Sequence, residues 1–274
     1  MSSGWPERGS VPPGTRSPGR RFSSSQLAIA RIDLARNQAQ AARAGQLQSD
    51  AFLSEQVNEP FAYYVEPDTQ RLRAKLPLHF MALNDYISES GGTCAIVLDE
   101  RGNEVGVMSW IHPAAAAAVS VAAGDAAMVR YEKRLVDLWG PDAASRYWDG
   151  CGSMEAVVDA AAGLPGERAL CIVLCVVVPH LFGQGAGTAM LQRFLADPGI
   201  VQDATHLMAA TETTGFWRRI GMHQVGLDIH VPPQGRSLGF CWRVYKGSVS
   251  QVVERLRELA GTPLHPEKPW PTSC

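Results

Sequence analysis

Three features are missing from this sequence: paired cysteines, a long apolar run, and an excess of charge of one sign. The six cysteines (Cys94, Cys151, Cys171, Cys175, Cys241 and Cys274) include no CxxC pair. The spacing typical of zinc sites is therefore absent, and we expect no metal. The longest apolar stretch, 169–182, has about 14 residues, fewer than the roughly 20 that a membrane-spanning helix needs. We therefore expect no membrane partner.

The charge balance and the N-terminus exclude further classes of protein. The formal net charge is −2 at pH 7, and the N-terminal tail holds a single basic pair, Arg20-Arg21. No basic field for nucleic acid results, so no nucleic-acid partner is expected. The N-terminus has no hydrophobic signal core, and unpaired thiols suit a reducing compartment, so we expect a cytoplasmic protein. A mitochondrial presequence near Arg21–Ser24 is the alternative, although upstream prolines would interrupt its amphipathic helix.

Composition is that of a globular protein with tails. A length of 274 residues and an apolar content of 46% allow one large domain with a sizeable core. Residues 1–25 are rich in Ser, Gly, Pro and Arg and are expected to form a disordered tail. We place one domain over residues 26–247, with a helical insert at 114–166, and a C-terminal helix and tail over 248–274.

Apolar periodicity and turn residues predict the elements of this domain. Strands are expected at 27–34, 93–98, 104–111, 170–178, 206–211, 225–231 and 239–245, and helices at 37–52, 68–88, 214–220, from 184, and after 248. Asp68, Ser153 and Ser248 are expected to cap helices, the second of which would end at Gly163. If 170–178 is a strand, then Cys171 and Cys175 share one of its faces.

A glycine-spaced turn follows the apolar strand at 170–178. Gly183-Gln184-Gly185-Ala186-Gly187 leads into a helix whose first amides and dipole favour an anion, and glycine lets a phosphate approach the backbone. No Lys follows the glycines, so the P-loop pattern does not fit. Met190 stands where a dinucleotide fingerprint needs its third glycine. A purely structural tight turn is the alternative for such a short motif.

Two segments in order resemble the GNAT acetyltransferases. Phe182–Gly187 is similar to the family's Q/R-x-x-G-x-G/A turn in every position but the first, and Val176–Pro179 is similar to its V-x-P strand end. Downstream, Phe216–Met222 is similar to the family's L/F-Y-x-K/R-x-G-F segment. Early and late segments, Phe61–Arg73, Val107–Pro113, Val231–Pro233 and Phe240–Arg243, resemble the puromycin acetyltransferase-like branch, so the resemblance spans about Leu27 to Lys246.

The resemblance implies both a fold and a reaction. The expected fold is α/β (α+β), the GNAT acyl-CoA fold, with a mixed, mostly antiparallel sheet that is splayed at its central strands and flanked by helices. The expected activity is direct transfer of acetyl from acetyl-CoA, a co-substrate, to an amine of a small molecule. The strand edge would bind the pantetheine arm and backbone amides the pyrophosphate. The implied binding residues are Val176, Val177, Val178, Gln184, Gly185, Ala186, Gly187, Thr188 and Ala189.

The expected catalytic residues are Glu212, His180 and Trp217. Trp217 stands where the family often has a Tyr that protonates the leaving thiolate, and an indole N–H cannot act as an acid at neutral pH. We therefore expect a slower enzyme or another acid, unless Trp217 only packs on the cofactor or the core. Glu212 and His180 are candidate bases that would relay a proton through water. The alternatives are a solvated carboxylate and a surface loop residue.

Trp110 and Tyr131 are the candidates for contact with the acceptor, because aromatic side chains crowd the insert and the strand before it. Core packing of the insert helices is the alternative for these aromatic residues. Two other functions stay open: an acyl-CoA-binding protein with weak or no catalysis, and acetylation of a protein N-terminus or lysine. The bulky insert favours a covered pocket over an open peptide groove.

Overall fold

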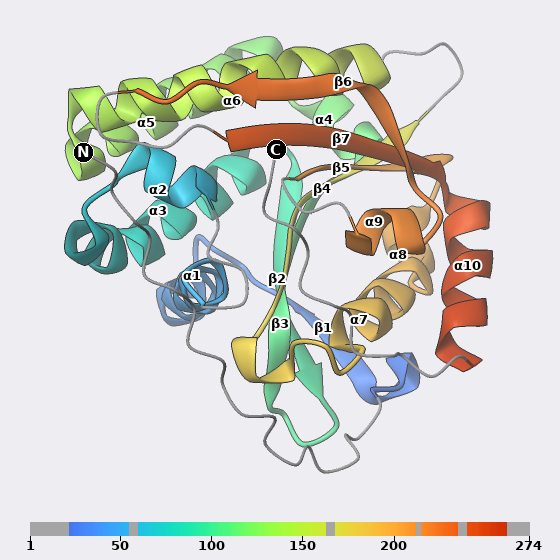
Figure 1. Cartoon of the computed structure of the whole chain (residues 1–274). Coiled ribbons are helices and arrows are strands. Elements are labelled where there is room, and N and C mark those ends of the chain that lie inside the picture. The colour runs from blue at the N-terminus through green and yellow to red at the C-terminus, as the bar shows by residue number, and fades with distance from the viewer. Residues whose placement is uncertain (1–21, 55–59, 163–167, 212–214, 235–239, 262–274) are drawn as a thin grey trace, which may run out of the picture.

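The computed structural model describes residues 22–54, 60–162, 168–211, 215–234 and 240–261. Seven strands form one sheet in the order β1-β2-β3-β4-β5-β7-β6 (Figure 1). The strands are β1 (Leu27–Arg31), β2 (Gly92–Asp99), β3 (Glu104–Ile111), β4 (Ala169–Val177), β5 (His206–Thr211), β6 (His223–Val231) and β7 (Phe240–Ser248). All neighbours are antiparallel except β4 and β5. The predicted mixed, mostly antiparallel sheet is confirmed.

Helices cover both faces of the sheet. They are α1 (Gln38–Phe52), α2 (Pro60–Val65), α3 (Thr69–Glu89), α4 (Pro113–Ala118), α5 (Val121–Trp139), α6 (Pro141–Ala162), α7 (Ala186–Leu195), α8 (Pro198–Val201), α9 (Gly215–Arg219) and α10 (Val249–Gly261), with short 3-10 helices η1 (Ser24–Gln26) and η2 (Pro179–Leu181). The alternation along β2 shows the two layers. Ala95 and Val97 pack in the core cluster of α7, whereas Cys94 and Ile96 pack in the cluster of α1. This part of the sheet is therefore buried on both faces.

The predicted helix caps at Asp68 and Ser248 are confirmed by hydrogen bonds to amides of the first helical turn. Asp68 Oδ1 accepts a hydrogen bond from the Arg71 amide at 2.9 Å, and Ser248 Oγ accepts one from the Gln251 amide at 3.2 Å. The predicted cap at Ser153 is wrong, because this residue lies inside α6, which begins at Pro141. Gly163 lies outside the described residues, as do residues 1–21 of the predicted tail and 262–274. The helix α2 was not anticipated.

A bulge in β4 changes which side chains share a face. The β3–β4 register shifts by one residue between the pairs Ser109↔Leu174 and Trp110↔Ile172, which leaves Val173 as the extra residue. Ile172 and Cys175 therefore both pack toward α7, although they are three residues apart. The expectation that Cys171 and Cys175 share a face is wrong for this reason. Among the described helices, none is both long and apolar enough to cross a membrane.

Candidate functional site

The two parallel strands β4 and β5 separate soon after they meet. They pair at four positions, from Ala169↔His206 to Ile172↔Ala209. Beyond the bulge at Val173, β4 continues along β3 to Val177, and among the described residues no strand pairs with its other edge. Residues 173–177 therefore present an open backbone edge, which is a template for an extended ligand that carries amide groups.

The end of β4 leads directly to the N-terminus of α7. Gly183 and Gly185 have φ angles of 73° and 83°, a left-handed conformation that glycine adopts without steric cost. Gly185 is the N-cap, and no side chain caps the helix. The Ala189 amide donates to the Gly185 carbonyl at 3.0 Å, so the three preceding helical amides, 186–188, come before the first intrahelical bond. Together with the helix dipole, these three amides suit an anion.

The predicted cofactor-binding residues differ in their backbone hydrogen bonds and packing, and their binding roles stay predictions. The amides of Gln184 and Ala189 already donate to the Leu181 and Gly185 carbonyls, whereas Ala186, Gly187 and Thr188 are placed to receive an anion. The strand residues divide as well: Val176 and Val178 pack in the cluster of α1. Only Val177 packs toward α7.

Three elements meet at Gly187. A Cβ on this residue would lie 3.5 Å from Val177 Cγ2 and 3.6 Å from Phe216 Cε2. The end of β4, the start of α7 and α9 are thus in van der Waals reach of one another. The structure therefore brings together the strand end, the glycine turn and the Phe216–Met222 segment that the sequence singled out.

Two grooves flank the turn, and Phe22 and Gln184 line both. One, of about 530 Å³, lies between Gly185 and Thr188 of α7 and Arg257 of α10. The other, of about 850 Å³, includes His180 on one side and the Arg43–Glu104 ion pair on the other. Sequence reasoning missed Phe22 and Arg257, because both come from segments distant in the chain and carry no local motif.

The candidate catalytic residues have different surroundings. His180 is exposed in η2, and its carbonyl accepts a hydrogen bond from Gln184 Nε2 at 2.7 Å. Trp217 is 6% exposed and packs in the α7 core cluster, edge to face with Phe216 at 5.1 Å between ring centroids. Glu212 lies outside the described residues. Their catalytic roles stay predictions.

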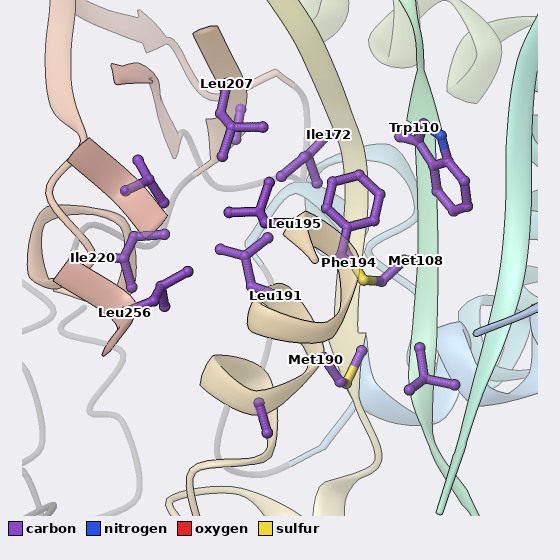
Figure 2. Close-up of a cluster of buried hydrophobic side chains, with 14 of the residues drawn as sticks. Met108, Trp110, Ile172, Met190, Leu191, Phe194, Leu195, Leu207, Ile220 and Leu256 are labelled. Carbon is purple, nitrogen blue, oxygen red and sulfur yellow. The ribbon is translucent and has the colours of Figure 1, made fainter. Parts of the chain in front are cut away.

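The two residues predicted for acceptor contact lie in different cores. Trp110 is 3% exposed and packs edge to face on Phe194 of α7, at 5.1 Å between ring centroids (Figure 2). Tyr131 is 2% exposed in the cluster of α3, α5 and α6, where its hydroxyl donates to the Tyr147 hydroxyl at 2.8 Å. The structure therefore does not bring these two side chains together, and a shared contact with one acceptor stays a prediction.

A buried histidine lies in the same cluster as Tyr131. Trp139 Nε1 donates to His79 Nδ1 at 3.1 Å, and the rings of Tyr131 and Tyr147 pack around it. Burial lowers the pKa of His79 to about 4, so the imidazole is neutral at physiological pH. The sequence gave no signal for this pair, because Trp139 and His79 come from different helices, α5 and α3.

No family model matches the chain, and no curated protein sequence matches it. Similar solved structures include one described as histone acetyltransferase HPA2 and related acetyltransferase, from Corynebacterium glutamicum, at 18% identity over 81% of this chain and 95% of that chain, with a TM-score of 0.46. A polyamine N-acetyltransferase from Drosophila melanogaster matches at 13% identity over 81% and 99%, with a TM-score of 0.48. FeeM, an N-acyl amino acid synthase from uncultured soil microbes, matches at 13% over 84% and 94%, with a TM-score of 0.43. With TM-scores below 0.5, these likenesses carry no weight for the activity of this chain.

Proposed function

We propose that this protein is an acetyl-CoA-dependent N-acetyltransferase that moves an acetyl group to an amine of a small molecule. The observation that carries the proposal is the open edge of β4 at 173–177, which leads directly to the uncapped N-terminus of α7. A ligand that combines an amide-bearing extended arm with a pyrophosphate matches both features, because the arm can pair with the edge of β4 while the pyrophosphate lies at the N-terminus of α7.

The pantetheine arm would lie along β4 as an added strand, with its amides paired to the backbone edge. The pyrophosphate would accept hydrogen bonds from the amides of residues 186–188. Since these contacts use backbone, Phe182 in place of Gln or Arg removes at most one charge-assisted contact, worth about 1.5–3 kcal/mol. The proposal also includes the puromycin acetyltransferase-like branch, which the segments Phe61–Arg73 and Val107–Pro113 support.

In the reaction, the neutral amine nitrogen attacks the thioester carbonyl carbon. A C–N bond forms, the C–S bond breaks, the amine proton goes to a base through water, and the CoA sulfur leaves as a thiolate. Of the two candidate bases, His180 is the one that lies among the described residues, and it is exposed in the groove beside the turn. A thiol has a reference pKa near 8.5, so the thiolate can leave without a general acid, which Trp217 cannot supply.

The proposal is tested by two measurements on the full chain. Calorimetry measures acetyl-CoA affinity, and thiol release measures turnover with a diamine, an arylamine, a free amino acid and a short peptide. We expect binding, and turnover with at least one of the small amines. Binding without turnover on any acceptor would favour the non-catalytic alternative, turnover on the peptide alone would favour protein acetylation, and no binding would reject the proposed function.

A further inference from the structure

The hairpin of β6 and β7 gathers three side chains of metal-ligating type. Asp228 lies at the irregularity of β6 between Val225 and Ile229, two residues before His230. His230 is the register partner of Cys241 on β7. One carboxylate oxygen of Asp228, one ring nitrogen of His230 and Cys241 Sγ lie within 4.8 Å of one another. Strand register places His230 opposite Cys241, and the cluster does not depend on the proposed function.

We propose that Asp228, His230 and Cys241 form a binding site for a divalent transition-metal ion of the zinc type, with solvent in the fourth position. Thiolate, imidazole and carboxylate are the three ligand types that Zn²⁺ takes in proteins, and Mg²⁺ or Ca²⁺ would require oxygen ligands instead. Tetrahedral zinc with bonds of 2.0–2.3 Å places its ligand atoms about 3.3–3.6 Å apart. Side-chain rotation, above all of the exposed His230, closes the remaining ångström or so.

The neighbours of Asp228 orient its carboxylate. Gln224 Nε2 donates to Oδ1 at 2.6 Å, and Arg243 donates to Oδ2 twice, from Nη2 at 2.9 Å and from Nε at 3.2 Å. Ligating carboxylates are commonly held by such outer hydrogen bonds, and an ionised carboxylate has about four lone-pair sites, so these three bonds leave one site for the ion. The Arg243 charge opposes a cation, however, and so lowers the affinity of the site.

The remaining ligands differ in accessibility. Cys241 is 4% exposed, whereas His230 is exposed, so an ion would enter from the imidazole side. When its sulfur binds, the Cys241 thiol releases its proton to solvent. Arg243, which holds Asp228, pairs in register with Thr211, the last residue of β5, so the cluster lies near the C-terminal end of that strand.

Titration of the full, untagged chain with Co²⁺ tests this site, since a thiolate-to-cobalt charge-transfer band reports sulfur ligation. We expect one equivalent of Co²⁺, displaced by Zn²⁺. Cys241→Ser should abolish the charge-transfer band, and His230→Ala should weaken binding at least about 10-fold, the lower end of what loss of an outer-shell partner costs. Cys171→Ser and His223→Ala, a half-buried thiol and an exposed histidine outside the cluster, are the matched controls and should bind as the wild type does.

Two further variants test the role assigned to Asp228. Arg243→Gln removes the competing cation and should tighten Co²⁺ binding, whereas Asp228→Asn should weaken it. Because His230 is exposed, its variant should fold normally even if substitution of the buried Cys241 destabilises the hairpin, and thermal unfolding of each variant checks this. The site is rejected if the wild type binds no Co²⁺, if the charge-transfer band survives in Cys241→Ser, or if His230→Ala binds as tightly as His223→Ala.

Discussion

A negative charge at the third residue of α7 should have opposite effects on two quantities: it should stabilise the helix and weaken the binding of acetyl-CoA. The Thr188 amide is the last of the three that precede the first intrahelical hydrogen bond. Thr188 also lines the groove of about 530 Å³, together with Arg257. Thr188→Glu therefore has room for the longer side chain. A carboxylate in the first turn interacts favourably with the helix dipole, so the free energy of unfolding should rise by about 0.3–1 kcal/mol.

The same carboxylate would repel a bound pyrophosphate. At about 5 Å and an effective dielectric constant of about 20, each phosphate charge costs about 3 kcal/mol. One tenfold step in an equilibrium constant corresponds to about 1.4 kcal/mol, so one phosphate charge at that distance should raise the Kd for acetyl-CoA by about two orders of magnitude, and the second charge should raise it further. Added salt should narrow this difference, because it screens charges near the surface.

Calorimetry with acetyl-CoA and thermal unfolding are the two measurements, and Thr188→Gln is the matched control with nearly the same size and no charge. We expect the control to bind within a few-fold of the wild type and the Glu variant to bind far more weakly with an unchanged or raised Tm. Equal affinity of the Glu and Gln variants would refute the placement of the pyrophosphate at 186–188. A large fall in Tm for the Glu variant would contradict the assignment of the helix start.

Two other perturbations have signs that the structure decides. A Cβ at Gly106 would lie 2.1 Å from the Val176 carbonyl oxygen, so Gly106→Ala should destabilise the fold by at least about 1–3 kcal/mol. A Cβ at Gly187 would have no contact closer than 3.5 Å, so Gly187→Ala should be neutral or stabilising by up to about 1 kcal/mol. Equal losses of the free energy of unfolding in urea would contradict the close β3–β4 packing. The folded-state pKa of His79 is about 4 against 6.5 unfolded, so its contribution is fully present above pH 6.5 and falls as the pH drops toward 4, by about 3 kcal/mol in all. In His79→Asn, whose side-chain oxygen can accept from Trp139, the free energy of unfolding should vary less over this pH range; an unchanged pH dependence would show that His79 is not the titrating group.

Helix caps, the glycine turn and one strand could be predicted from the sequence, because the residues that determine them are neighbours in the chain. Asp68 and Ser248 cap helices through amides three residues away, so their patterns predicted the starts of α3 and α10. The glycine turn was equally local, since Gly183 and Gly185 adopt the positive φ angles that few other residues tolerate. Strand β5 was predicted with its observed bounds, His206–Thr211.

Predictions failed where a distant partner decides the outcome. The extra residue at Val173 is defined only by the pairing with β3, and it reverses the face on which Cys175 lies. The insert prediction failed at Ser153 because α6 continues through that residue. Likewise, Trp110 and Tyr131 are both aromatic and near the insert in sequence, yet they pack in separate clusters.

The sequence by itself determined an apolar strand, a glycine turn and a helix after it whose first amides have no intrahelical acceptor, because backbone conformation and helix ends depend on residues within one turn. Only the tertiary structure decided that β4 and β5 pair at four positions and then separate. It also decided that Phe216 reaches Gly187, and that His230 faces Cys241 across a hairpin. Register and layer packing depend on contacts between residues far apart in the chain, and those contacts place an open strand edge beside the glycine turn.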